Sequence, residues 1–228
     1  MPSIVLLHGA LGSTQQLNSL HTGLQLKGVQ VYELNFSGHG GNSFGKNFGI
    51  EQFANEVEYF IQSKELSDVT IFGYSMGGYV ATWLTARHSR LISRIITLGT
   101  KFDWSPESAE KEIKRMNPEK IEEKIPAFAR ILEHRHQPND WKLLMKRTSN
   151  MMKQLGERPL LTEQNLKQVQ DKVLIILGDQ DDMADLKYSQ KVSAWIPNSK
   201  FVLLENTPHP IEKVDHSKLS KLILGELD

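Results

Sequence analysis

Short apolar runs and longer amphipathic stretches alternate along most of the chain. The runs are rich in Val, Ile and Leu, and runs of this kind predict buried strands. They lie at residues 4–7, 29–34, 69–72, 94–98, 173–177 and 201–204. Between them, apolar side chains recur with the spacing of helices that are covered on one face. These helical stretches are residues 14–26, 50–63, 79–88, 186–195 and 211–224.

Alternating strands and helices predict an α/β fold with a mostly parallel sheet of about six strands and helices on both faces. Ligands of such sheets bind at the carboxyl ends of the strands. Four loops with chemically active side chains directly follow predicted strands, at His8, Ser75, Asp181 and His209. We therefore expect these loops to gather at one edge of the sheet.

The alternation is interrupted at residues 100–172, which are charged, helical in pattern and poor in strands. Prolines divide this stretch into several short helices. They are Pro106, Pro118, Pro126, Pro138 and Pro159. We predict a core of residues 1–99 and 173–228, with 100–172 inserted after the fourth strand as a helical cap. Its charge-rich run at 107–124 is expected to be a solvated helix face.

The composition mainly excludes certain kinds of partner and site. Lysine plus arginine and aspartate plus glutamate both number 27, so a net charge near zero gives no reason to expect nucleic acid or a membrane surface as partner. No apolar run is long enough to span a bilayer. The absence of cysteine excludes thiolate nucleophiles and cysteine metal sites. We expect no metal and no cofactor, and a cytoplasmic location because a secretory signal pattern is missing.

The strand at 69–72 runs into the sequence G-Y-S-M-G-G, and a helical pattern follows. A serine in a tight turn between strand and helix is the context of a nucleophile elbow. Gly73 and Gly77 stand where side chains would collide with the crossing strand and helix. The N-terminus of the following helix aims free N–H groups at the same place. Ser75 is therefore the candidate nucleophile.

Five motifs in a fixed order extend this observation over essentially the whole chain. They are H-G-A-L-G-S at 8–13, F-S-G-H-G-G-N-S at 36–43, G-Y-S-M-G-G at 73–78, L-G-D-Q-D-D-M at 177–183 and T-P-H-P at 207–210. With them, the chain resembles an α/β-hydrolase. The antiparallel hairpin that usually precedes the first parallel strand of that fold is missing, which implies a reduced sheet and leaves monomer and homodimer open.

The resemblance implies that His209 is the base that activates Ser75. It also implies that the acid supporting this base is Asp181, three residues after the glycine that closes the fifth strand. Three other carboxylates stay open for this role: Asp103, Asp179 and Asp182. Among the remaining histidines, the resemblance makes His8 structural, while His39 is expected to shape the rim of the site.

A tetrahedral intermediate needs preorganised donors for its oxyanion. One is expected from the backbone N–H of Met76, the residue after the nucleophile. The other is expected from Ala10 or Leu11, and the resemblance favours Ala10. Four residues are expected to line an apolar substrate pocket, two of them in the cap: Leu11, Tyr74, Trp104 and Met145.

These expectations describe a serine hydrolase that cleaves a small, partly apolar carboxylic ester through an acyl-enzyme, with a small molecule as its partner. Two alternatives remain. The same fold and triad serve carbon–carbon bond hydrolases and lyases of the menaquinone pathway, and a ligand-binding receptor without catalysis can keep the triad. The substrate does not follow from the sequence, because many chemistries share this fold.

Overall fold

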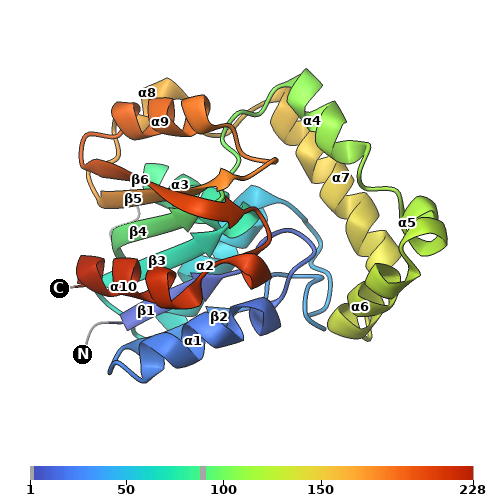
Figure 1. Cartoon of the computed structure of the whole chain (residues 1–228), viewed down its shortest axis with the longest axis horizontal. Coiled ribbons are helices and arrows are strands. Elements are labelled where there is room, and N and C mark those ends of the chain that lie inside the picture. The colour runs from blue at the N-terminus through green and yellow to red at the C-terminus, as the bar shows by residue number, and fades with distance from the viewer. Residues whose placement is uncertain (1–2, 88–90, 228) are drawn as a thin grey trace.

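Six parallel strands form one sheet at the centre of the computed structural model, which describes residues 3–87 and 91–227 (Figure 1). The strands are β1 (Ser3–Leu7), β2 (Gln30–Leu34), β3 (Val69–Tyr74), β4 (Ile92–Leu98), β5 (Lys172–Gln180) and β6 (Ser199–Pro208). Their order across the sheet is β2-β1-β3-β4-β5-β6, and each neighbouring pair is parallel. The predicted α/β class and the parallel sheet of about six strands are confirmed.

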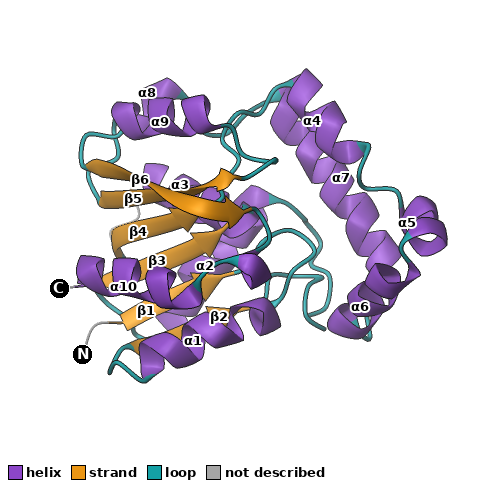
Figure 2. Cartoon of the chain, viewed as in Figure 1, coloured by secondary structure: helices purple, strands orange, loops and turns teal. Residues whose placement is uncertain are grey.

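Helices cover both faces of this sheet (Figure 2). One face packs against α1 (Asn18–Gln25) and α10 (His216–Leu227), and the other against α2 (Ile50–Ser63), α3 (Met76–Ala86) and α9 (Leu186–Trp195). Within residues 3–87 and 91–227, none of the helices is long and apolar enough to cross a membrane.

The strand β1 shows how its sequence divides the interior into two cores. Successive side chains of a strand point to opposite faces. Val5 and Leu7 pack with the helices of one face, whereas Ile4 and Leu6 pack with those of the other. All four are fully buried. A strand that is covered on both sides has no polar alternation, which explains the continuous apolar run in the sequence.

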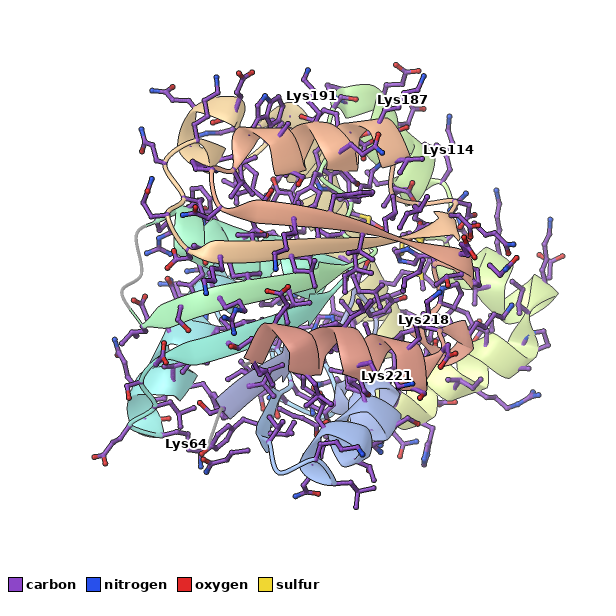
Figure 3. The ribbon with its side chains drawn as sticks, turned by 60° about the vertical axis from the view of Figure 1, so that its left-hand side comes forward. Lys64, Lys114, Lys187, Lys191, Lys218 and Lys221 are labelled. Atoms are coloured by element: carbon purple, nitrogen blue, oxygen red, sulfur yellow. The ribbon has the colours of Figure 1, made fainter. Side chains whose placement is uncertain are left out.

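Charged side chains occupy the outer faces of the covering helices. Figure 3 shows Lys191 of α9 and Lys218 and Lys221 of α10 pointing away from the sheet. On the inner faces of the same two helices, Val192 and Leu219 are fully buried. These helices therefore have the amphipathic character that their sequence spacing predicts.

Between β4 and β5 the chain forms helices, and all but the last of them make a layer beside the sheet (Figure 1). They are α4 (Pro106–Ile113), α5 (Pro118–Lys124), α6 (Pro126–His136), α7 (Trp141–Glu157) and α8 (Glu163–Leu166). The first three begin with proline, whose missing N–H has no helical partner at that position in any case. The short helix α8 lies outside this layer, because its Leu166 packs in the core.

Two predicted strands and two predicted helices have clearly different ends in the structure. The strands β5 and β6 continue into polar residues because their backbones still pair, as far as Gln180 and Pro208. The helix predicted at 79–88 begins earlier, at Met76, and residue 88 lies outside the described residues. The helix predicted at 14–26 starts as a 3-10 turn, η1 (Thr14–Leu17), which leads directly into α1.

The last predicted helix, 211–224, is divided in the structure. A 3-10 turn, η2 (Ile211–Lys213), comes first, and α10 begins at His216. Asp215 accounts for the division, because its Oδ1 accepts hydrogen bonds from the N–H groups of Ser217 at 2.9 Å and Lys218 at 3.0 Å. A side chain that satisfies the first free N–H groups of a helix fixes where that helix starts.

Truncating the core should cost far more stability than truncating the surface. Phe72 of β3 is fully buried, whereas Tyr59 of α2 is 74% exposed. We expect Phe72→Ala to lower the free energy of unfolding by about 3–5 kcal/mol. Tyr59→Ala should change it by about 0.5 kcal/mol or less. Urea unfolding of both variants measures the difference, and similar losses in the two would contradict this assignment of the core.

Candidate active site

Ser75 lies in the sharp turn between β3 and α3, with φ 52° and ψ −114°. A residue other than glycine in this region is strained, and such residues are concentrated at functional sites. The end of β4 holds the turn in place. The N–H of Ser75 donates to the carbonyl of Leu98 at 2.8 Å, and Thr100 Oγ1 donates to the carbonyl of Ser75 at 3.1 Å.

Two glycines of the turn are required by close backbone approach. A Cβ atom at Gly73 would lie 2.4 Å from the amide nitrogen of Gly78, and one at Gly77 would lie 2.5 Å from the carbonyl oxygen of Leu7. Backbone atoms cannot move aside as a flexible side chain can. The turn therefore tolerates no side chain at either position without displacing α3.

His209 and Asp181 follow β6 and β5, and their side chains pair at the edge of the sheet. His209 Nδ1 lies 2.8 Å from Asp181 Oδ2, and the two side chains are 8% and 2% exposed. The other carboxylate oxygen, Oδ1, accepts from the N–H groups of Met183 and Ala184, both at 2.9 Å. A carboxylate held in this way fixes the orientation of the imidazole. Nε2 is then the ring nitrogen of His209 that does not contact Asp181.

The other three candidate carboxylates have different surroundings. Asp103 pairs with Lys101, whose Nζ lies 3.0 Å from Oδ2. Asp179 Oδ1 accepts from the N–H of Thr207 at 3.0 Å, a bond that lowers the pKa of this carboxyl group. The side chain of Asp182 is 71% exposed. The candidate base is thus paired with the carboxylate that the sequence motif favours.

Two further residues shape the surroundings of the base. A Cβ atom at Gly99, which has φ +59°, would lie 3.0 Å from Asp181 Oδ2 and 3.3 Å from His209 Nδ1. The hydroxyl of Tyr74 donates to the carbonyl of His209 at 3.1 Å. Burial raises the pKa of Tyr74, so its hydroxyl stays protonated and can donate. The sequence analysis did not identify Gly99 as a site residue, although a glycine directly after a strand at this edge can indicate a close approach of other atoms.

A cavity of about 160 Å³ lies where the strand ends meet the cap. Ser75 and His209 line it together with Ala10 and Met76, so the candidate nucleophile, base and oxyanion residues face one space. Of the predicted pocket residues, Tyr74 and Trp104 line it as well. The cap adds mostly apolar side chains to the wall: Met116, Met151, Met152 and Leu155.

The predicted pocket residues Leu11 and Met145 are not among those that line this cavity. They belong to a separate apolar cluster in which the cap rests on the first loop. Leu11 has φ 55°, and its carbonyl accepts hydrogen bonds from Arg135 Nη1 and His136 Nε2, each at 3.0 Å. Both donors belong to α6, so this end of the cap is attached to the loop that contains Ala10.

Three fully buried histidines connect the first loop, the glycine-rich loop and the cap. His8 Nε2 accepts from the N–H of Phe36 at 3.2 Å, and His136 Nδ1 accepts from the N–H of Gly40 at 3.1 Å. The ring of His39 lies between them, with centroid distances of 4.9 Å to His8 and 5.8 Å to His136. Ring nitrogens that accept hydrogen bonds have to be unprotonated.

Burial enforces this neutral state. It lowers the pKa of His8 and of His136 from 6.5 to about 4, and it lowers the pKa of His39 well below 6.5. As the pH falls from 6.5 towards 4, the unfolded chain binds protons that the folded chain does not, so stability is lost in this window. For His8 alone, the loss at pH 5 is on the order of 2 kcal/mol.

Comparisons with known proteins show the family and the fold of the chain. Residues 2–129 match the sequence model of a family described as alpha/beta hydrolase fold. Among curated proteins, the sn-1-specific diacylglycerol lipase ABHD11 of Mus musculus is 27% identical over 169 residues. This alignment covers 71% of the present chain and 50% of the mouse protein, so the chain spans about half the length of that relative.

Solved structures resemble the chain over nearly its full length. The esterase EaEST from Exiguobacterium antarcticum has a TM-score of 0.79 at 16% identity and covers 100% of this chain and 92% of its own. The enol-lactonase from Burkholderia xenovorans LB400 has a TM-score of 0.76 at 20% identity, with 99% and 91% covered. At such identities, the likeness shows the fold.

The buried histidines predict a loss of stability in mild acid that one substitution should reduce. In His39→Phe, a ring still stacks on Phe48, whose centroid lies 5.9 Å away, but one group that resists protonation is gone. We expect the free energy of unfolding to fall less between about pH 7 and pH 5 in this variant than in the wild type. Urea unfolding at several pH values measures both slopes. The exposed His134→Gln serves as the control, and equal slopes in wild type and His39→Phe would contradict the assignment.

Proposed function

Since the chain belongs to the alpha/beta hydrolase fold family, we propose that it is a serine hydrolase that cleaves a small, partly apolar carboxylic ester. The observation that supports this most directly is the shared cavity. Ser75, in its strained turn, lines the same space as His209, which is paired with Asp181. The mouse relative is a diacylglycerol lipase and one fold neighbour is an esterase, and both names support the same class of bond.

In the proposed reaction, Ser75 Oγ attacks the ester carbonyl while His209 Nε2 accepts its proton. Asp181 stabilises the imidazolium that forms. The oxyanion accepts hydrogen bonds from the N–H groups of Ala10 and Met76. The imidazolium then protonates the departing alcohol, and an acyl-enzyme remains on Ser75. A water molecule, deprotonated by His209, attacks this acyl group and releases the acid.

The cavity supports a small acyl or alcohol group with apolar character. Its volume of about 160 Å³ is modest, and cap methionines contribute to the wall. Methionine side chains have three rotatable bonds and adapt to groups of different shape. A cavity wall that adapts in this way suits substrates that share size and polarity rather than one rigid shape.

Substituting the nucleophile should abolish covalent chemistry without unfolding the protein. We expect a fluorophosphonate probe to label the wild type and not Ser75→Ala. Turnover of an activated ester should fall by roughly four to six orders of magnitude in the variant. Circular dichroism serves as the folding control. A folded wild type that stays unlabelled and inactive would favour the receptor alternative, and turnover of a vinylogous diketone without any ester turnover would favour carbon–carbon bond hydrolysis.

The acid of the triad can be assigned by comparing two substitutions of equal chemistry. Asp181→Asn should lower kcat by roughly 10⁴-fold, because the amide favours the wrong tautomer of His209. Asp103→Asn should stay within a few-fold of the wild type, since its carboxylate pairs with Lys101. Steady-state kinetics on one ester measures both. Severe loss in Asp103→Asn with a nearly normal Asp181→Asn would move the acid to the end of β4.

A further inference from the structure

Glu112 places a buried carboxylate in the wall of the candidate active-site cavity. It belongs to the cap helix α4, and its side chain is 2% exposed. The residue lines the same cavity as Ser75 and His209. The prediction of a solvated face over residues 107–124 is wrong at this position. The face of α4 that holds Ala109 and Glu112 is buried, and Ala109 packs closely against Gly156 of α7.

The carboxylate of Glu112 lacks the hydrogen bonds that a buried charge requires. Among the described residues, neither Oε1 nor Oε2 has a hydrogen-bond partner. Its ion-pair contact is long, at 3.7 Å from Arg115 Nη1 to Oε2, and the Arg115 side chain is 45% exposed. A buried carboxylate without hydrogen bonds is costly in free energy, and a donor from a bound molecule would offset this cost.

Trp104, which lines the same cavity, has an unpaired donor. Its indole Nε1 is buried and has no hydrogen-bond partner in the part of the chain that the structure describes. Lys101 also lines the cavity, with its Nζ 5.5 Å from the centroid of the Trp104 ring. That ammonium group is held by Asp103 at 3.0 Å. The residues of the wall thus include one with an unpaired acceptor, one with an unpaired donor and one with a positive charge.

We propose that Glu112 is a substrate-recognition residue that accepts a hydrogen bond from a hydroxyl group, so that the enzyme selects hydroxylated esters. A hydroxyl group both donates and accepts, which matches the carboxylate of Glu112 and the N–H of Trp104. An ammonium group only donates, so it would leave the N–H of Trp104 without an acceptor. A plain hydrocarbon chain would satisfy neither group.

The inference rests on the proposed function for the bond that is cleaved, but recognition of the hydroxyl group does not require turnover. If the inference holds, the correct substrate donates a hydrogen bond to the buried carboxylate of Glu112 and so offsets the free-energy cost of its burial. The deoxy analogue does not. A site built to bond a substrate hydroxyl rejects the analogue that lacks it, because its own polar groups are then left unpaired.

Matched ester pairs test the proposal by activity. The probes are methyl hexanoate against methyl ω-hydroxyhexanoate, and butyl butanoate against ω-hydroxybutyl butanoate, which place the hydroxyl group on the acyl or the alcohol side. We expect the wild type to prefer the hydroxylated member of at least one pair in kcat/KM. Glu112→Leu should reduce this preference by roughly tenfold to a hundredfold. Glu112→Gln keeps the volume of the side chain, and it should show a smaller loss of the same kind.

Arg115→Gln is the matched control, because it removes the ion pair and leaves the carboxylate in place. It should keep the preference for the hydroxyl group. If Glu112 acts merely by packing or by pairing with Arg115, the substitutions at both positions will change all four esters alike. That result, or a stronger preference for ω-amino esters than for ω-hydroxy esters, would overturn the proposal.

Binding in a Ser75→Ala background separates this inference from the proposed function. Isothermal titration calorimetry should give a tighter Kd for the hydroxylated ester than for its plain partner, and Glu112→Leu should abolish the difference. If no ester is turned over but this Glu112-dependent difference persists, the proposed function fails and the inference stands. If Ser75-dependent ester hydrolysis occurs without preference for a hydroxyl group in either assay, the inference fails and the proposed function stands.

Discussion

The close approach of the first turn of α3 to β1 and to the end of β3 is the constraint on which the site depends. Backbone atoms come so near that a Cβ atom at Gly77 would lie 2.5 Å from the carbonyl oxygen of Leu7. Because strand and helix meet at this distance, the chain must turn sharply at Ser75, which takes φ 52°. The same contact sets Met76 beside the loop that follows β1, where Ala10 lies. One packing requirement therefore positions both the serine and its neighbouring N–H groups.

The paired side chains of His209 and Asp181 depend on a second set of backbone contacts. Asp181 follows β5 and His209 follows β6. These strands are adjacent in the sheet, so the loops that follow them lie side by side. Gly99, at the end of β4, leaves room for the pair, and Tyr74 fixes the backbone of His209. The arrangement needs four neighbouring strands to end at one edge, which a parallel sheet provides.

Sequence patterns predicted the elements of this fold better than the contacts between them. The helices at 50–63 and 186–195 have the predicted bounds, because one clear apolar face defines each. Leu11 and Met145 were expected at the pocket, but their place depends on how the cap meets the first loop, which helical spacing does not encode. Glu112 shows the same limit most clearly. A glutamate within a charged run is expected to be exposed, and only the packing of α4 on α7 shows that it is buried.

The two hydrogen bonds from α6 to the carbonyl of Leu11 have a consequence for how the cap can move. Arg135 and His136 donate to the carbonyl of Leu11, which follows Ala10 in the same loop. Lifting α6 would break both hydrogen bonds and remove this support from the loop that contains Ala10. At the other end of the layer, the chain enters the cap before α4 and leaves it after α7, where Gly156 lies against Ser105. The cap is thus held at both ends, by hydrogen bonds from α6 to the first loop and by its own chain connections beside α4 and α7.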